Sequence, residues 1–348
     1  MQLLRSALRI PGGGAIVRRD EMEMKASGTT STGLRFATVL WDRQATLVGV
    51  LDEAVVHLGA AARALRRSRK EMKAAEYVPA DMLGLIGGGP SSLKAAQAVL
   101  RAAGRHLEGG SWKIRAQDPI VRPLGRARLL SPIPRPGRNI FCVGPNYVEH
   151  AKEQGAEVPT LPVFFTKPPT AVVGHEADVV AWPVTQNLDY EVELAVVIGK
   201  RGRDIPRAKA YEHVFGYTIL NDITARDLQR KHAQWFKGKS LDTFAPLGPW
   251  IVHKSALADP HALRITLRVN GEIRQEATTA DMIFRIEDLI EALSAGMTLE
   301  PGDIIATGTP SGVGAGFVPP QWLKVGDVLE AEVEGIGMLR NRIIAPGR

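Results

Sequence analysis

A short acidic segment between apolar residues constrains this chain more than any other feature. Residues 188–199 read Leu-Asp-Tyr-Glu-Val-Glu-Leu-Ala-Val-Val-Ile-Gly, a branched apolar run that ends at a glycine and is typical of a buried β-strand. Side chains alternate faces along a strand, so Glu191 and Glu193 are predicted to point to the same side. Two buried carboxylates on one face repel each other unless a cation or a proton joins them. The pattern therefore indicates a metal site.

A second apolar run supplies the third carboxylate of this predicted site. Residues 214–220 form the run, and Asn221-Asp222 ends it. Delivered from a neighbouring strand end, Asp222 completes an all-oxygen set with Glu191 and Glu193 that suits Mg²⁺ or Mn²⁺ rather than zinc. The alternative is a solvent-facing acidic strand edge, which is the commoner fate of a Glu-x-Glu pair. The apolar flanks favour the metal, because they imply that the strand is largely buried.

Length and composition describe a folded protein of two domains. The chain has 348 residues, of which 45% are hydrophobic and 23% charged. No apolar run approaches the ~18 residues of a membrane span, so we expect no membrane partner. The single cysteine, Cys142, excludes an internal disulfide and fits the cytoplasmic location that we expect.

The net charge of +7 raises the question of a nucleic-acid partner, and its distribution argues against one. Residues 1–130 hold 21 Lys and Arg against 11 Asp and Glu, whereas residues 131–348 hold 23 against 26. Much of the excess lies on one predicted helix, which carries Arg63, Arg66, Arg67, Arg69, Lys70 and Lys73. This face lacks interleaved aromatic residues, so we favour a solvated helix face over an RNA-binding patch.

The chain divides into three parts. Residues 1–24 are expected to be a non-structural extension, either upstream of a natural start at Met24 or a weak organellar presequence. Residues 25–130 are predicted to form a small α+β domain, with strands at 35–40 and 45–51 and helices at 60–76 and 92–105. The glycine run 84–89 between these helices is not a phosphate loop, since no Lys-Ser/Thr follows it.

Residues 131–348 are predicted to form the metal-binding domain, entered through the stiff proline-rich segment 131–136. Strands are expected at 163–167, 190–198, 214–220, 249–252, 263–269, 303–307 and 327–333, and short helices at 148–154, 224–229 and 285–295. So many strands without long connecting helices indicate a β-sandwich or open β-roll, and a mainly β (α+β) fold for the whole chain.

Three further features of this domain could carry chemistry. His150 and Glu153 are spaced to share one helical face, where the carboxylate could fix the imidazole tautomer and leave a base toward water; the alternative is a surface helix cap. Lys239 follows a glycine and could stabilise an enolate or carboxylate, although alone it is a loop lysine. The turns of residues 306–314 could aim backbone amides and hydroxyls at an anion.

Together these motifs, in their order, resemble the fumarylacetoacetate hydrolase family over about residues 139–341. The resemblance rests on Gly-Pro-Asn-Tyr followed by His150-Ala-Lys-Glu153, Asp-Tyr-Glu-Val-Glu-Leu-Ala from 189, Asn-Asp-Ile-Thr-Ala-Arg-Asp-Leu-Gln from 221, Gly-Lys-Ser from 238, Val-Asn-Gly-Glu from 269 and Thr-Gly-Thr-Pro from 307. The amino-terminal part also resembles the small domain that precedes the catalytic domain in many bacterial members.

The resemblance implies a β-sandwich-like roll, a homodimer, and Mg²⁺ or Mn²⁺ held by Glu191, Glu193 and Asp222. It further implies that His150 and Glu153 form a water-activating dyad on a lid and that Lys239 lies beside the metal. The residues that it places at the substrate site are Tyr147, Arg226, Gln229, Gly308 and Thr309.

From these residues we expect a metal-dependent hydrolase that cleaves a C–C bond of a small 2,4-diketo acid of the acylpyruvate type, as in the catabolism of aromatic compounds. Oxaloacetate decarboxylation or isomerisation of a hydroxydienedioate would use the same half-site, because each reaction passes through an enolate. A metal-binding scaffold without activity is the remaining alternative, and the presence of His150, Glu153 and Lys239 argues against it.

Overall fold

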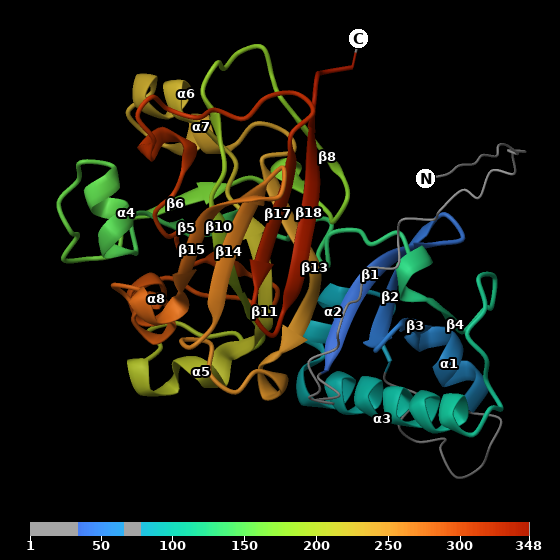
Figure 1. Cartoon of the computed structure of the whole chain (residues 1–348). Coiled ribbons are helices and arrows are strands. Elements are labelled where there is room, and N and C mark those ends of the chain that lie inside the picture. Colours follow the sequence, from blue (N-terminus) through green and yellow to red (C-terminus); the bar gives the residue numbers. More distant parts are fainter. Residues whose placement is uncertain (1–33, 66–77, 348) are drawn as a thin grey trace, which may run out of the picture. The chain divides into compact units, whose positions relative to one another are not determined.

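Two β-sheets form the framework of the protein (Figure 1). The larger has eleven strands in the order β4-β3-β2-β1-β13-β11-β10-β16-β5-β6, with β7 paired to β13. The smaller has five strands in the order β15-β14-β17-β18-β8, and β12 and β9 form a short separate pair. The computed structural model describes residues 34–65 and 78–347. The expected extension 1–24 and the basic segment from Arg66 to Lys73 lie outside this part of the chain.

The strands carry the labels of Figure 1. They are β1 (Arg35–Trp41), β2 (Gln44–Leu51), β3 (Ala54–His57), β4 (Val121–Pro123), β5 (Ile140–Val143), β6 (Phe164–Lys167), β7 (Val172–Val173), β8 (Asp178–Val180), β9 (Leu188–Asp189), β10 (Val192–Ile198), β11 (Val214–Asn221), β12 (Thr224–Ala225), β13 (Ala245–His253), β14 (Arg264–Val269), β15 (Glu272–Thr278), β16 (Ile304–Ala306), β17 (Val328–Val333) and β18 (Gly337–Ile344).

The helices of the described residues are mostly short. They are α1 (Leu58–Leu65), α2 (Met82–Gly87), α3 (Gly89–Glu108), α4 (Val148–Glu153), α5 (Ala210–His213), α6 (Arg226–Lys231), α7 (Phe236–Lys239) and α8 (Ile286–Ser294). In Figure 1, α6 and α7 lie side by side at one end of the two sheets, α5 and α8 lie at the opposite end, and α4 projects at one edge. None of these helices combines the length and hydropathy needed to cross a membrane.

Strand β10 lies at the centre of the structure, and all seven of its residues are buried. One face, with Leu194, Val196 and Ile198, packs in a core shared with β14, β17 and β18. The opposite face, with Ala195 and Val197, belongs to a second core that includes side chains of α1, α2 and α3. Burial on both faces explains why the strand reads as a continuous apolar run rather than an alternating one.

The predicted mainly β, α+β fold with a sandwich of two sheets is confirmed, and the seven strands predicted in residues 131–348 all exist, with ends shifted by a few residues. The boundary between the two domains stays a prediction. The sheet itself continues across it, because β1 pairs with β13. Leu34 also belongs to this junction, since its carbonyl accepts a hydrogen bond from His253 N at 2.9 Å.

Three local features differ from the sequence-based expectation. The glycine-rich segment after Asp81 contains helix α2, because Asp81 caps it by accepting a 2.7 Å hydrogen bond from Gly84 N and its apolar side chains are buried. Lys239 ends a short helix, α7, instead of lying in a loop. Strands β15 and β18 were missed, because their polar residues hide the alternation that marks a half-buried strand.

Candidate active site

Three acidic side chains meet at the start of β10 and the end of β11. The antiparallel register sets Val192 opposite Asn221, so Glu191 and Glu193 flank the point at which Asp222 leaves β11. One carboxylate oxygen from each of the three lies within 4.8 Å of the others, and all three residues are buried. The sequence predicts this set, and the structure brings its members together. Asp189 lies outside it.

The electrostatics of these carboxylates fit a divalent cation. Glu193 is buried beside Asp222 and Glu191, and burial together with their charges raises its pKa well above the usual value. Its carboxylate accepts a hydrogen bond from Gly308 N at 2.8 Å and forms no ion pair with any residue that the structure describes. A hard dication would remove this repulsion, and the all-oxygen donor set suits one.

Two cations, Lys239 and Arg226, hold the other carboxylates in place. The Lys239 ammonium donates to Glu191 at 2.8 Å and to Asp222 at 2.9 Å. Arg226 donates from Nε to Asp189 at 2.9 Å and pairs through Nη2 with Glu191 at 2.7 Å. Although burial opposes ionisation of Glu191, the charges of Lys239 and Arg226 outweigh it and lower its pKa to about 2. Burial likewise opposes the charge of Lys239, yet Asp222 and Glu191 raise its pKa above the usual value.

A third cation, Lys167, was not identified from the sequence. It is fully buried at the end of β6 and donates to Asp222 at 2.5 Å and to the Ile223 carbonyl at 3.1 Å. It also donates to the Lys239 carbonyl. Lys167 therefore fixes one candidate metal ligand and the helix that carries Lys239. The one sequence signal is its place at the end of an apolar strand before Pro168-Pro169, where a lysine has little water to reach.

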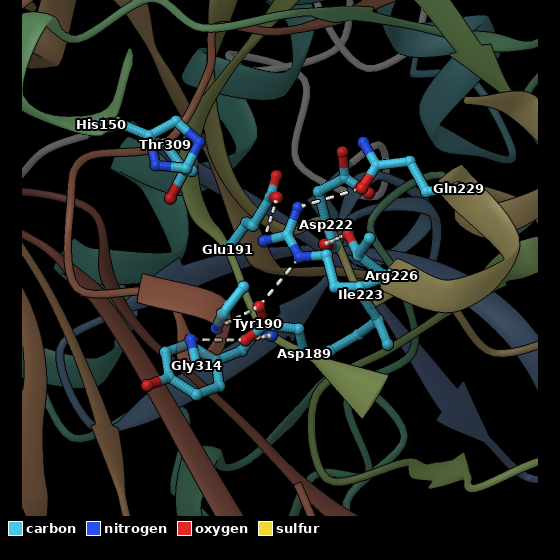
Figure 2. Close-up of polar contacts among 12 residues, drawn as sticks. His150, Asp189, Tyr190, Glu191, Asp222, Ile223, Arg226, Gln229, Thr309 and Gly314 are labelled. Carbon is cyan, nitrogen blue, oxygen red and sulfur yellow. Dashed lines mark hydrogen bonds and ion pairs between the residues drawn. The ribbon is translucent and has the colours of Figure 1, made fainter. Parts of the chain in front are cut away.

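Asp189 was also missed as a structural anchor of the site. Its carboxylate accepts hydrogen bonds from Gly314 N at 2.7 Å and Ala315 N at 3.0 Å, besides the bond from Arg226. In Figure 2 this carboxylate lies between Gly314 and Arg226. Asp189 thus ties the loop after residue 312 to the strand that leads into the acidic triad.

The predicted dyad forms on α4. His150 Nδ1 lies 3.1 Å from Glu153 Oε2, and His150 is buried. A carboxylate can only accept here, so Nδ1 carries the proton and Nε2 is left as a base. The other oxygen of Glu153 accepts from Gly312 N at 2.9 Å, which holds α4 against the loop that Asp189 also anchors.

A cavity of about 390 Å³ lies beside the dyad and the acidic triad. His150, Glu191, Arg226, Gln229, Lys239 and Thr309, all predicted site residues, lie among those that line it. Its apolar wall comes from Val143, Phe165 and Trp235, with the two rings edge to face at 5.3 Å. The cavity can therefore hold a small ligand beside Glu191 of the acidic triad, Lys239 and His150.

The remaining predicted residues take other places. Tyr147 lines a separate cavity of about 330 Å³ with Glu149 and Asp281. Gly308 contributes its backbone amide to Glu193, and its φ of +95° suits glycine. The Thr309 hydroxyl donates to the Val192 carbonyl at 2.9 Å and accepts from Gln275 at 2.8 Å. The roles of these residues toward substrate stay predictions.

Comparison with known proteins places this geometry among enzymes of one family. Residues 139–344 match the profile of the fumarylacetoacetate (FAA) hydrolase C-terminal domain. Oxaloacetate tautomerase YisK from Bacillus subtilis (strain 168) is 46% identical over 318 residues, covering 89% of this chain and all of the relative.

Solved structures agree with this match. Fumarylacetoacetate hydrolase from the psychrophile Exiguobacterium antarcticum superposes with a TM-score of 0.71 at 37% identity, over 90% of this chain and all of the other. Maleylpyruvate hydrolase from Sphingobium sp. SYK-6, solved with manganese(II) and pyruvate, superposes with a TM-score of 0.66 at 29% identity, again over 90% of this chain and all of that one.

Proposed function

Because the chain belongs to the fumarylacetoacetate hydrolase family and is an enzyme of it, we propose that it stabilises the enolate of a small 2-keto acid with the help of a divalent metal. The reaction that we propose is the keto–enol tautomerisation of oxaloacetate, in which one proton moves between the C2 oxygen and C3. The observation that carries the proposal is one cavity lined by His150, Lys239 and Glu191, the last of which is a member of the acidic triad.

The acidic triad would position the substrate through the metal that it holds. Glu191, Glu193 and Asp222 would hold Mg²⁺ or Mn²⁺, which supplies Lewis-acid polarisation of a 2-keto carboxylate when it is bound. Lys239 has three N–H donors, two of which donate to Glu191 and Asp222. The third is left for an oxygen that gains negative charge in the enolate, in a site where burial strengthens that attraction.

The dyad moves the proton at carbon. Nε2 of His150 takes a proton from C3 of the keto form and returns it to C3 of the enol, while Glu153 keeps Nδ1 protonated and orients the ring. Gly312 N holds Glu153 in turn, so the base keeps its direction through the cycle. The proton on the C2 oxygen leaves to solvent or returns from it.

A second candidate reaction is favoured by the same dyad. An imidazole paired with a carboxylate could deprotonate water for attack at C4 of a 2,4-diketo acid, after which the C3–C4 bond breaks to give a carboxylic acid and enolpyruvate. This hydrolysis, as in the catabolism of aromatic compounds, is the reaction expected from the sequence. The relative of high identity is a tautomerase, and for that reason we place tautomerisation first. Decarboxylation of oxaloacetate and isomerisation of a hydroxydienedioate use the same enolate and come after both.

Parallel assays of two substrates test the proposal. Enol-oxaloacetate is followed by the loss of its ultraviolet absorbance, and an acylpyruvate by its acid product, each with Mg²⁺ and with Mn²⁺. We expect a larger kcat/KM for the enol, and a loss of roughly 10²- to 10⁴-fold on His150→Asn, as for a general base. The exposed His232 lies outside the cavity lining, so His232→Asn is the matched control. Faster cleavage of the acylpyruvate would make the protein a hydrolase, and turnover of neither substrate would refute both reactions.

The homodimer and the cytoplasmic location that the sequence analysis expected belong to this proposal as well. Light scattering of the purified protein tests the first, since a mass of one 37.7 kDa chain at micromolar concentration would contradict it. Fractionation of the source cells tests the second.

A further inference from the structure

We propose that Arg230 binds the second carboxylate of the substrate and so makes the cavity selective for dicarboxylic 2-keto acids. The inference rests on the proposed function and adds a residue and a substrate class to it. Arg230 is absent from the site residues that the sequence predicted, yet it is one of the residues that line the cavity together with Glu191 of the acidic triad.

Helix α6 explains how Arg230 reaches the cavity. Residues three and four apart on a helix lie on the same face, so Arg226, Gln229 and Arg230 share one side of α6. All three line the cavity, whereas Lys231, the next residue, does not. Backbone contact with α7 fixes this face, because a Cβ on Gly238 would lie 2.5 Å from Gln229 N.

The charges of the lining residues single out Arg230. Lys239 already contacts Glu191 and Asp222, and Arg226 already contacts Asp189 and Glu191, so protein carboxylates balance both cations. Within residues 34–65 and 78–347, Arg230 forms no ion pair. It is therefore the cation of this cavity that has a guanidinium free for an anionic ligand, and a guanidinium matches a carboxylate with two parallel hydrogen bonds.

Part of the cavity wall is apolar and closely packed. Phe165 and Trp235 face the cavity, and Gly144 leaves so little room that a Cβ there would lie 3.0 Å from the Trp235 ring. A short carbon chain fits between such walls, with one carboxylate at the triad and the other at Arg230. A monocarboxylate of the same length would leave the Arg230 guanidinium without an anion.

Binding of two hydroxy acids tests the inference apart from turnover. L-Malate and L-lactate differ by the second carboxylate, and neither is consumed by tautomerisation. Their dissociation constants are measured calorimetrically on the Mg²⁺-loaded full chain of the wild type, Arg230→Gln, Arg230→Lys and Lys231→Gln. Lys231→Gln removes the same charge from the same helix outside the cavity and is the matched control.

We expect the wild type to prefer malate over lactate, and Arg230→Gln to reduce that preference on the order of 10-fold, since hydrogen bonds to a charged group are strong but this residue is largely exposed. Arg230→Lys should keep part of the preference, and Lys231→Gln all of it. Equal preference in the wild type and Arg230→Gln, or no preference in the wild type, would overturn the inference. Intact selectivity in an enzyme that does not tautomerise enol-oxaloacetate would refute the proposed reaction and leave the role of Arg230 standing.

Discussion

Replacing Lys167 by Met should strongly destabilise the protein, and its structural surroundings set the size of the effect. The lysine has no exposed surface, and its ammonium donates to Asp222, to the Ile223 carbonyl and to the Lys239 carbonyl. Methionine is unbranched and of similar length, so the change removes the charge with little change in packed volume.

The expected loss follows from what is left behind. Asp222 keeps the Lys239 ammonium at 2.9 Å, but it loses its 2.5 Å contact in a site without solvent. Removing one partner of a buried ion pair costs about 3–5 kcal/mol. The two carbonyls lose a donor as well, so we place the effect within that range and not below it. Since Lys167 also holds the carbonyl of Lys239, kcat should fall with stability.

Urea unfolding in the presence of chelator measures the effect. The free energy of unfolding is compared between the wild type and Lys167→Met, with equal m-values as the condition for comparison. Lys152→Met is the control, because its pair with Glu149 is exposed on α4 and should contribute less than about 1 kcal/mol. A loss below about 1 kcal/mol for Lys167→Met would show that the buried pair does not support the triad as inferred.

Three further predictions concern packing, anchoring and pH. Gly238→Ala should cost about 1–3 kcal/mol and lower kcat, because the new Cβ would meet Gln229 N at 2.5 Å and push away the helix that carries Lys239; unchanged turnover would contradict this. Asp189→Asn should destabilise the protein by roughly 3–5 kcal/mol in urea, since it leaves the buried Arg226 without one carboxylate, and a near-neutral effect would refute the anchoring role. Burial, and then the charge of Lys254, lower the pKa of His253 to about 4, so below pH 6.5 the unfolded chain binds a proton that the folded chain does not. Stability should therefore fall between pH 6.5 and 4, and a His253→Gln variant with the same slope would exclude this histidine as the cause.

The acidic triad could be predicted because its signals are local. Alternation along one strand places Glu191 and Glu193 on the same side, and Asp222 directly follows a second apolar run. The spacing of His150 and Glu153 is a local signal too, since one helical turn brings them within 3.1 Å. Each of these inferences needs knowledge of a single element and its neighbour.

Lys167 and Asp189 could not be predicted in this way, because their partners lie far away in the sequence or are backbone groups. Lys167 meets Asp222 across 55 residues and otherwise contacts carbonyl oxygens. Asp189 accepts from two backbone amides more than 120 residues later. Backbone donors leave no mark in a sequence, and a buried lysine contradicts the ordinary expectation that lysines are exposed.

The pairing of the strands other than β10 and β11 could not be predicted from the sequence either. The sequence indicates that strands β14 and β15 form a hairpin only through the turn at Asn270-Gly271, since β15 is too polar to read as a strand. Helix α7 is four residues long and is held by contacts with its neighbours rather than by its own propensity. Tertiary packing therefore decides where Lys239 points.

The central claim is that a metal at Glu191, Glu193 and Asp222 drives the enolate chemistry, and one titration tests it most directly. Metal-stripped enzyme is titrated with Mn²⁺ while the bound ion is counted by electron paramagnetic resonance and the decay of enol-oxaloacetate is followed in the same samples. Glu193→Gln is titrated beside it, with the exposed Glu157→Gln as control. We predict one tightly bound ion per chain, a decay rate that rises in proportion to its occupancy, and loss of both in Glu193→Gln alone. Undiminished decay in the metal-stripped wild type, or full activity of Glu193→Gln, would contradict the claim.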